Sequence, residues 1–121
     1  MHEVVTVPKP WGSEIIWAHT TAYVGKILNI DAGRRLSLQL HERKTETILV
    51  AEGRLLLHHG PSQDRIETKE LGPGDSFHVP VGLVHRFEAI EDTKLIEVST
   101  PELDDVVRLV DDFGREGTTQ A

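Results

Sequence analysis

The chain has 121 residues, with 13 basic and 20 acidic side chains, 7 histidines, no cysteine and a formal net charge of −7. This length suits one domain built around one hydrophobic core. The excess of acidic side chains argues against nucleic acid as a partner, because a phosphate backbone needs a clustered basic surface. No apolar run approaches the roughly 20 residues of a membrane helix, so we expect a cytoplasmic protein that does not enter a membrane.

Residues 1–12 are predicted to form an N-terminal arm. Pro8 and Pro10 lack the backbone donor that a central strand requires. We expect Trp11 to anchor this arm against the rest of the domain.

Residues 13–99 are predicted to form a β-barrel. Short aliphatic and β-branched segments alternate here with turn formers, a spacing typical of an all-β sandwich or barrel. Nothing between them is long enough for a crossover helix, so the strands should pair antiparallel. The expected strands are Glu14–Ala18, Tyr23–Ile30, Arg35–His41, Thr45–Ala51, Arg54–His58, Arg65–Leu71, Ser76–Val79, His85–Ala89 and Lys94–Ser99.

Residues 100–115 are predicted to form a short C-terminal helix and a tail. Thr100 is a suitable N-cap, a proline follows at the first helical position, and acidic residues lie near the positive end of the helix dipole. The helix is expected over Pro101–Leu109. Arg108 and Arg115 are candidates for side chains that approach the mouth of the barrel.

Polar side chains on three of the predicted strands suggest a metal site. Gln39 and His41 share one face of the strand Arg35–His41, because side chains alternate along a strand. If the next strand forms a hairpin with it, Glu46 returns beside them, and His85 opens a later strand. Taken singly, each is more often a solvated residue than a ligand, so spacing alone leaves both interpretations open. Together they suit a divalent ion, and we expect Zn²⁺, with Mn²⁺, Fe²⁺, Ni²⁺ and Co²⁺ as alternatives. Without cysteine, no thiolate can act as a ligand.

Two segments resemble the paired motifs of the cupin family. Residues Gly33–Gly53 resemble the first motif, with Gln39 where the family usually has histidine. Residues Gly74–His85 resemble the second, which departs from the family pattern only at Ala89, where asparagine is usual. The resemblance implies that residues 1–121 form a single-domain cupin, a double-stranded β-helix or jelly-roll barrel. It also implies the metal ligands Gln39, His41, Glu46 and His85.

Further segments resemble the type II phosphomannose isomerase domain, which commonly follows a mannose-1-phosphate guanylyltransferase domain in bifunctional enzymes. They are Pro10–Gly12, Leu36–His41, Leu95–Val98 and Asp104–Arg115. Gln39 is itself a feature of that branch. The nucleotidyltransferase half is absent, so no guanylyltransferase activity is expected. Lys44 stands where those enzymes often have arginine and Ile48 where they have tryptophan, so phosphate recognition should differ, because lysine lacks the guanidinium fork.

These features predict a metal-dependent aldose–ketose isomerase of a sugar phosphate, similar to mannose-6-phosphate isomerase. Glu97 lies in an apolar strand, where a carboxylate is costly unless paired, and is the candidate base. Lys44 is the candidate electrostatic partner for a substrate phosphate or hydroxyl. An outward-facing Glu97 and a solvated Lys44 are the alternatives. A non-catalytic metal- and sugar-binding cupin is the second functional hypothesis, and a metal-dependent oxygenase is the third.

The same alternation predicts a homodimer. If Gln39 and His41 face the interior, then Leu36, Leu38 and Leu40 face outward and form an apolar row of the kind found at interfaces. A second subunit or the N-terminal arm would cover this row, and we expect the second subunit.

Overall fold

The computed structural model describes residues 3–119, and this part of the chain is entirely β-structure and turns. The strands are β1 (Val5–Lys9), β2 (Gly12–His19), β3 (Val24–Ile30), β4 (Leu38–Leu40), β5 (Glu46–Glu52), β6 (Leu55–Gly60), β7 (Glu67–Leu71), β8 (Ser76–Val79), β9 (Val84–Ala89), β10 (Thr93–Ser99), β11 (Val106–Val110) and β12 (Gly117–Thr119). All nine strands expected between residues 13 and 99 are present. Within residues 3–119, no helix is long and apolar enough to cross a membrane.

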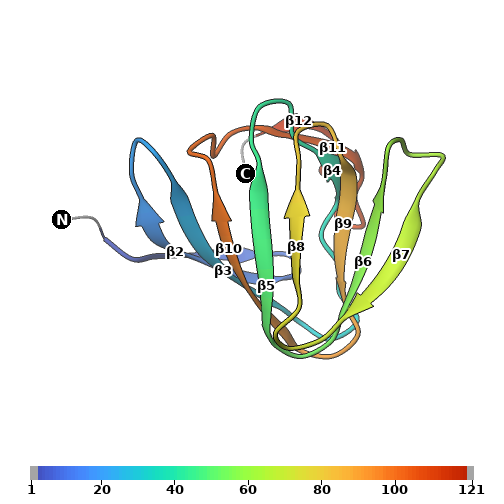
Figure 1. The fold of residues 1–121 in the computed structure, drawn as a ribbon, viewed down its shortest axis with the longest axis horizontal. Coiled ribbons are helices and arrows are strands. Elements are labelled where there is room, and N and C mark those ends of the chain that lie inside the picture. The colour runs from blue at the N-terminus through green and yellow to red at the C-terminus, as the bar shows by residue number, and fades with distance from the viewer. Residues whose placement is uncertain (1–2, 120–121) are drawn as a thin grey trace.

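The strands form two antiparallel sheets that enclose the core (Figure 1). One sheet has the order β1-β2-β3-β10-β5-β8, and the other has the order β12-β11-β4-β9-β6-β7. Their facing sides bury one cluster of apolar side chains, as in a sandwich or barrel. Its members are Trp11, Leu28, Ile30, Ile48, Val50, Leu55, Leu57, Leu71, Val79, Phe87, Ala89 and Leu95.

The predicted N-terminal arm is itself part of a sheet. Val5–Lys9 forms β1, the edge strand that pairs only with β2 in its sheet. An edge strand tolerates Pro8, because one side of its ladder needs no donor. Trp11 is 3% exposed and belongs to the core, so its role as the anchor is confirmed.

The strand expected over Arg35–His41 is shorter than predicted, since β4 covers only Leu38–Leu40. The guanidinium of Arg86 donates from Nε to the carbonyl oxygen of Leu36 at 2.8 Å. A side chain therefore satisfies a backbone acceptor that a ladder partner would otherwise satisfy, and regular pairing begins two residues later.

The predicted hairpin between β4 and β5 is wrong. The strand β4 pairs with β9 and β11, whereas β5 pairs with β8 and β10 in the other sheet. The turn between them therefore crosses from one sheet to the other. Glu46 still returns to face His41, but it does so across the interior of the sandwich and not across a hairpin ladder.

The predicted outward row of three leucines is also wrong in part. Leu36 packs against the core and lines an interior cavity. Leu38 is 8% exposed and Leu40 is half-buried. Leu36 and Ser37 are neighbours in sequence, yet both line the cavity. They can do so because they precede β4, where the regular alternation of strand side chains begins. The leucine row therefore no longer argues for a dimer, and the homodimer stays a prediction.

The helix expected over Pro101–Leu109 is wrong. Residues 106–110 form β11, which pairs with β4, and Figure 1 shows this C-terminal segment crossing the ends of the other strands. Thr100 does not cap a helix, because its Oγ1 accepts the amide of Thr45 at 3.1 Å. Three valines favour a strand at this position, and the ladder with β4 outweighs the local capping signals.

Asp105 fastens this segment to the turn between β4 and β5. Its carboxylate accepts three consecutive backbone amides, those of Glu42, Arg43 and Lys44, at 3.0, 2.7 and 2.8 Å. These amides have no ladder partner, so the carboxylate replaces one. Asp105 thereby fixes the turn, and with it the residues on either side of the turn.

We predict that Asp105→Ala lowers the free energy of unfolding by about 2–4 kcal/mol, because three amides lose a charged acceptor. Urea denaturation of the two proteins measures this difference. Asp104→Ala is the matched control, since Asp104 is exposed and its replacement should change stability by less than about 0.5 kcal/mol. Equal stability of the two variants would contradict the role assigned to Asp105.

Candidate metal centre

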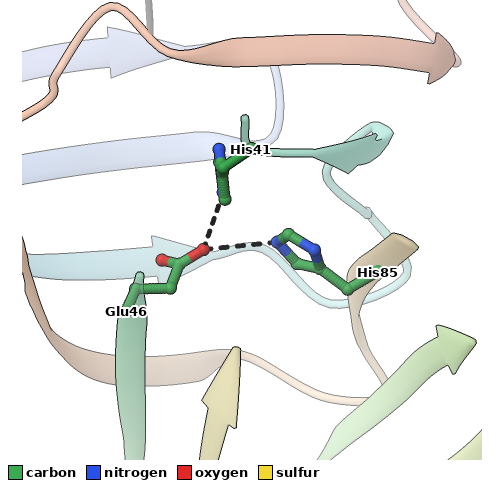
Figure 2. A group of neighbouring side chains, drawn as sticks. All are labelled: His41, Glu46 and His85. Carbon is green, nitrogen blue, oxygen red and sulfur yellow. Dashed lines mark hydrogen bonds and ion pairs between the residues drawn. The ribbon is translucent and has the colours of Figure 1, made fainter. Parts of the chain in front are cut away.

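Three predicted ligands converge in the interior from different strands (Figure 2). His41 directly follows β4, Glu46 opens β5, and His85 lies in β9. The Nε2 atoms of His41 and His85 lie 2.8 and 3.2 Å from Oε1 of Glu46. All three residues are buried, and one donor atom from each lies within 4.8 Å of the others.

The hydrogen bonds of the two imidazoles fix which nitrogen faces the centre. Nδ1 of His41 contacts the carbonyl oxygen of Asp105 at 2.6 Å, and Nδ1 of His85 contacts that of Leu83 at 2.9 Å. A carbonyl oxygen can only accept, so each Nδ1 carries a proton, and a neutral imidazole then turns a lone pair at Nε2 toward Glu46.

This donor set fits a divalent cation. Nε2 of His85 has no hydrogen-bond partner among the described residues, although it is buried. Two imidazole lone pairs and a carboxylate oxygen facing one another are all acceptors, which a shared cation satisfies. Carbonyl acceptors on the outer nitrogens are the usual way in which proteins orient metal-bound histidines.

Glu97, on β10, lies next to Glu46 in the same interior. Burial opposes ionisation of Glu46, but a hydrogen bond from the Glu97 carboxyl group and the charge of Lys44 help to hold its pKa well below the usual value. Burial and the charge of Glu46 raise the pKa of Glu97 well above its usual value. Glu97 is therefore the weaker acid of the pair, and it lies buried in the interior, so the outward-facing alternative does not hold.

Lys44 is buried and not solvated. It is 4% exposed, and its Nζ lies 3.8 Å from Oε2 of Glu97. Burial lowers the pKa of Lys44, but the carboxylates of Glu97 and Glu46 outweigh this effect and raise it. The ammonium group is therefore held charged beside the carboxyl pair.

Gln39 lies next to His85 across the β4–β9 ladder, and it lines the same cavity as His41 and Glu46. The hydroxyl of Ser37 donates to Oε1 of Gln39 at 2.6 Å. The amide oxygen is thereby held by its own strand, and its assignment as a fourth ligand stays a prediction.

These groups line a cavity of about 50 Å³, enough for an ion and a few small ligand atoms when a water needs about 10–15 Å³. Sequence reasoning missed several of its charged residues. Nζ of Lys26 donates to Oε1 of Glu14 at 2.8 Å in a buried ion pair, and Lys9 approaches the same carboxylate at 3.9 Å. The Glu14 and Lys26 side chains point inward by strand alternation, a signal that the sequence contains. Arg108 and Arg115, which the sequence left as candidates only, also line this cavity.

The fold and the donor set together define a cupin. The model of the cupin domain matches residues 26–99, which include all four predicted ligands, on β4, β5, β9 and the segment directly after β4. The chain belongs to the cupin family.

The relatives at the sequence level include two mannose-1-phosphate guanylyltransferases and a xanthan biosynthesis protein. Mannose-1-phosphate guanylyltransferase ManC of Salmonella typhimurium is 33% identical over 116 residues, which cover 90% of this chain. Mannose-1-phosphate guanylyltransferase of Escherichia coli is 32% identical over 114 residues, and xanthan biosynthesis protein XanB of Xanthomonas campestris is 29% identical over 114. The chain spans 23% of the length of each. They confirm the resemblance to the isomerase domain that accompanies such enzymes.

Solved structures support the same fold. KdgF from Halomonas sp. is 26% identical, with a TM-score of 0.68 over 83% of this chain and 88% of its own. Oxalate decarboxylase of Bacillus subtilis is 18% identical, with a TM-score of 0.74 over 87% of this chain and 30% of its own. At such low identity the decarboxylase supports the fold alone.

We predict that His41→Ala and His85→Ala each abolish stoichiometric metal binding, because each removes one of the two nitrogen donors from a site with three converging donor residues. Metal analysis of the purified variants after dialysis measures the effect. His19→Ala, at an exposed histidine, should leave the metal content unchanged. Full occupancy in both site variants would remove the ligand assignment.

Replacing Gln39 tests the fourth position. Imidazole is a stronger donor than a neutral amide oxygen, so Gln39→His should keep or raise the affinity for the metal. Competition with a chromophoric chelator gives the dissociation constant. A loss of affinity of about tenfold, or about 1.4 kcal/mol, would mean that the amide and its contact with Ser37 serve another purpose.

Proposed function

We propose that the protein is a metal-dependent aldose–ketose isomerase that acts on a sugar phosphate such as mannose 6-phosphate. One observation carries the proposal: Glu97, a buried carboxyl group with a raised pKa, lies in the same cavity as the metal donors His41 and Glu46. Relatives named for mannose 1-phosphate, which match 90% of the chain, support the substrate class.

The proposed ion is Zn²⁺, held by His41, Glu46 and His85 with Gln39 as a fourth ligand, and Mn²⁺, Fe²⁺, Ni²⁺ and Co²⁺ suit the same donors. When bound, such an ion polarises a substrate carbonyl or hydroxyl as a Lewis acid.

Glu97 moves the proton in this proposal. In the aldose-to-ketose direction its carboxylate removes the proton from the carbon next to the aldehyde, which gives an enediolate. The Glu97 carboxyl group then returns that proton to the former aldehyde carbon, while the hydroxyl proton passes between the two oxygens. A carboxyl group with a raised pKa is a stronger base once ionised, which suits this step. The ammonium of Lys44 stays beside Glu97 and balances its negative charge.

A non-catalytic metal- and sugar-binding module is the second candidate. The small cavity and the internal ion pairs, Lys26 with Glu14 and Lys44 with Glu97, favour it. Such a module would bind the sugar without turnover, so the decisive assay is the formation of fructose 6-phosphate from mannose 6-phosphate.

We predict that Glu97→Gln lowers kcat in that assay by about 10²–10⁴-fold, because general acid–base catalysis contributes this much. The amide can still donate to Glu46, so the metal content should stay the same. Glu52→Gln is the control, since Glu52 is exposed on β5. Absence of product with the metal-loaded wild-type protein would reject the isomerase and leave the binding module.

A further inference from the structure

One cationic side chain in the cavity has a buried donor without a hydrogen-bond partner among the described residues. The cationic residues that line the cavity are Lys9, Lys26, Lys44, Arg108 and Arg115. Lys26 is hydrogen-bonded to Glu14, and Arg115 is held by two bonds to Asp111 at 2.8 and 3.1 Å. Arg108 is 8% exposed, and its buried Nε has no hydrogen-bond partner among the described residues. A buried guanidinium with an open donor is costly to the folded protein.

Two further cations lie close enough to repel Arg108. Burial lowers the pKa of Arg108, and the charge of Arg115 lowers it further. Burial also lowers the pKa of Lys9, to which the charges of Lys26, Arg108 and Arg115 add, against the opposing effect of Glu14. Three cations that disfavour one another's charge in a shared cavity are stabilised when an anion enters between them.

The ladder places this cluster beside the metal donors. Arg108 on β11 pairs with Gln39 on β4, and Gln39 pairs with His85 on β9. Residues paired across a ladder project to the same face of the sheet. Arg108 therefore begins two strand spacings, about 10 Å, from the backbone of His85. The cavity is partly open to solvent, so a ligand larger than its enclosed volume can extend from its mouth while it contacts both the metal donors and the cations.

We propose that Arg108, flanked by Lys9 and Arg115, binds the phosphate group of a phosphorylated sugar whose other end lies at the metal donors. This inference rests on the proposed function and names the part of the site that selects a phosphorylated substrate. The guanidinium fork matches two phosphate oxygens, whereas Lys44, the residue expected from the sequence to meet the phosphate, is paired with Glu97 at the reacting end.

The test is direct binding, measured by isothermal titration calorimetry on the metal-loaded protein. The probes are mannose 6-phosphate, mannose and inorganic phosphate. Mannose 6-phosphate should bind much more tightly than mannose, and inorganic phosphate should compete with it. Arg108→Gln should raise the Kd for mannose 6-phosphate about 30-fold or more, the effect of removing one partner of a buried charged pair. The Kd of Arg108→Lys for mannose 6-phosphate should lie between those of the wild-type protein and Arg108→Gln.

The controls separate this effect from misfolding. Lys69→Gln removes the same charge from an exposed position on β7 and should leave the Kd unchanged. Circular dichroism and metal content check that Arg108→Gln is folded. If it is not folded, Lys9→Gln replaces it, with an expected weakening in the same direction.

The outcomes for the subsite and for catalysis are independent. Wild-type affinity for mannose 6-phosphate in a folded, metal-loaded Arg108→Gln protein overturns the subsite, even if that protein isomerises the sugar. Equal affinity of the wild-type protein for mannose and mannose 6-phosphate also overturns it. Weakened binding in Arg108→Gln without any fructose 6-phosphate from the wild-type protein supports the subsite and rejects the isomerase.

Discussion

A buried carboxylate that faces two imidazole nitrogens is the constraint on which the rest of the interior depends. In both histidines Nδ1 donates its proton to a backbone carbonyl oxygen. A neutral imidazole has only one N–H group, so Nε2 cannot also donate to Glu46 while the ring is neutral. A cation, or an added proton on each ring, must resolve this arrangement. Glu97 adds a second carboxyl group, whose pKa is raised by burial and by the negative charge of Glu46. Lys44 completes the group from the other side.

Much of the interior beyond this centre is charged, and that has an energetic cost. Lys26 and Glu14 form a buried pair whose removal from water cancels most of their attraction. Arg108 adds an open donor in the same cavity. An apolar core of the same volume would be more stable, and functional sites commonly reduce stability in this way. The apolar cluster on the facing sheets, with Trp11 and Phe87 at its edge toward the cavity, offsets this cost.

The sequence predicted the repeating features well and the interactions between distant segments poorly. Alternation and turn formers located nine strands, and the resemblance to the two cupin motifs identified His41, Glu46 and His85, which converge. The predicted hairpin of β4 and β5 was wrong because a short turn can either reverse the chain within one sheet or carry it to the other sheet, and here it does the second. The helix after Thr100 was wrong because its capping residues serve tertiary contacts. Nothing local in the sequence assigns Asp105 to three amides about 60 residues away.

The contact of Asp105 with the turn after His41 has a consequence for the order of folding events during synthesis of the chain. The carbonyl oxygen of Asp105 orients the His41 ring, and its carboxylate fixes the turn that leads to Glu46. Asp105 is translated after His41, Glu46 and His85 and lies 64 residues beyond His41. The three side chains can therefore meet in an oriented form only once the segment around Asp105 has been translated and has docked. A metal that binds them would in this way be coupled to the folding of that segment.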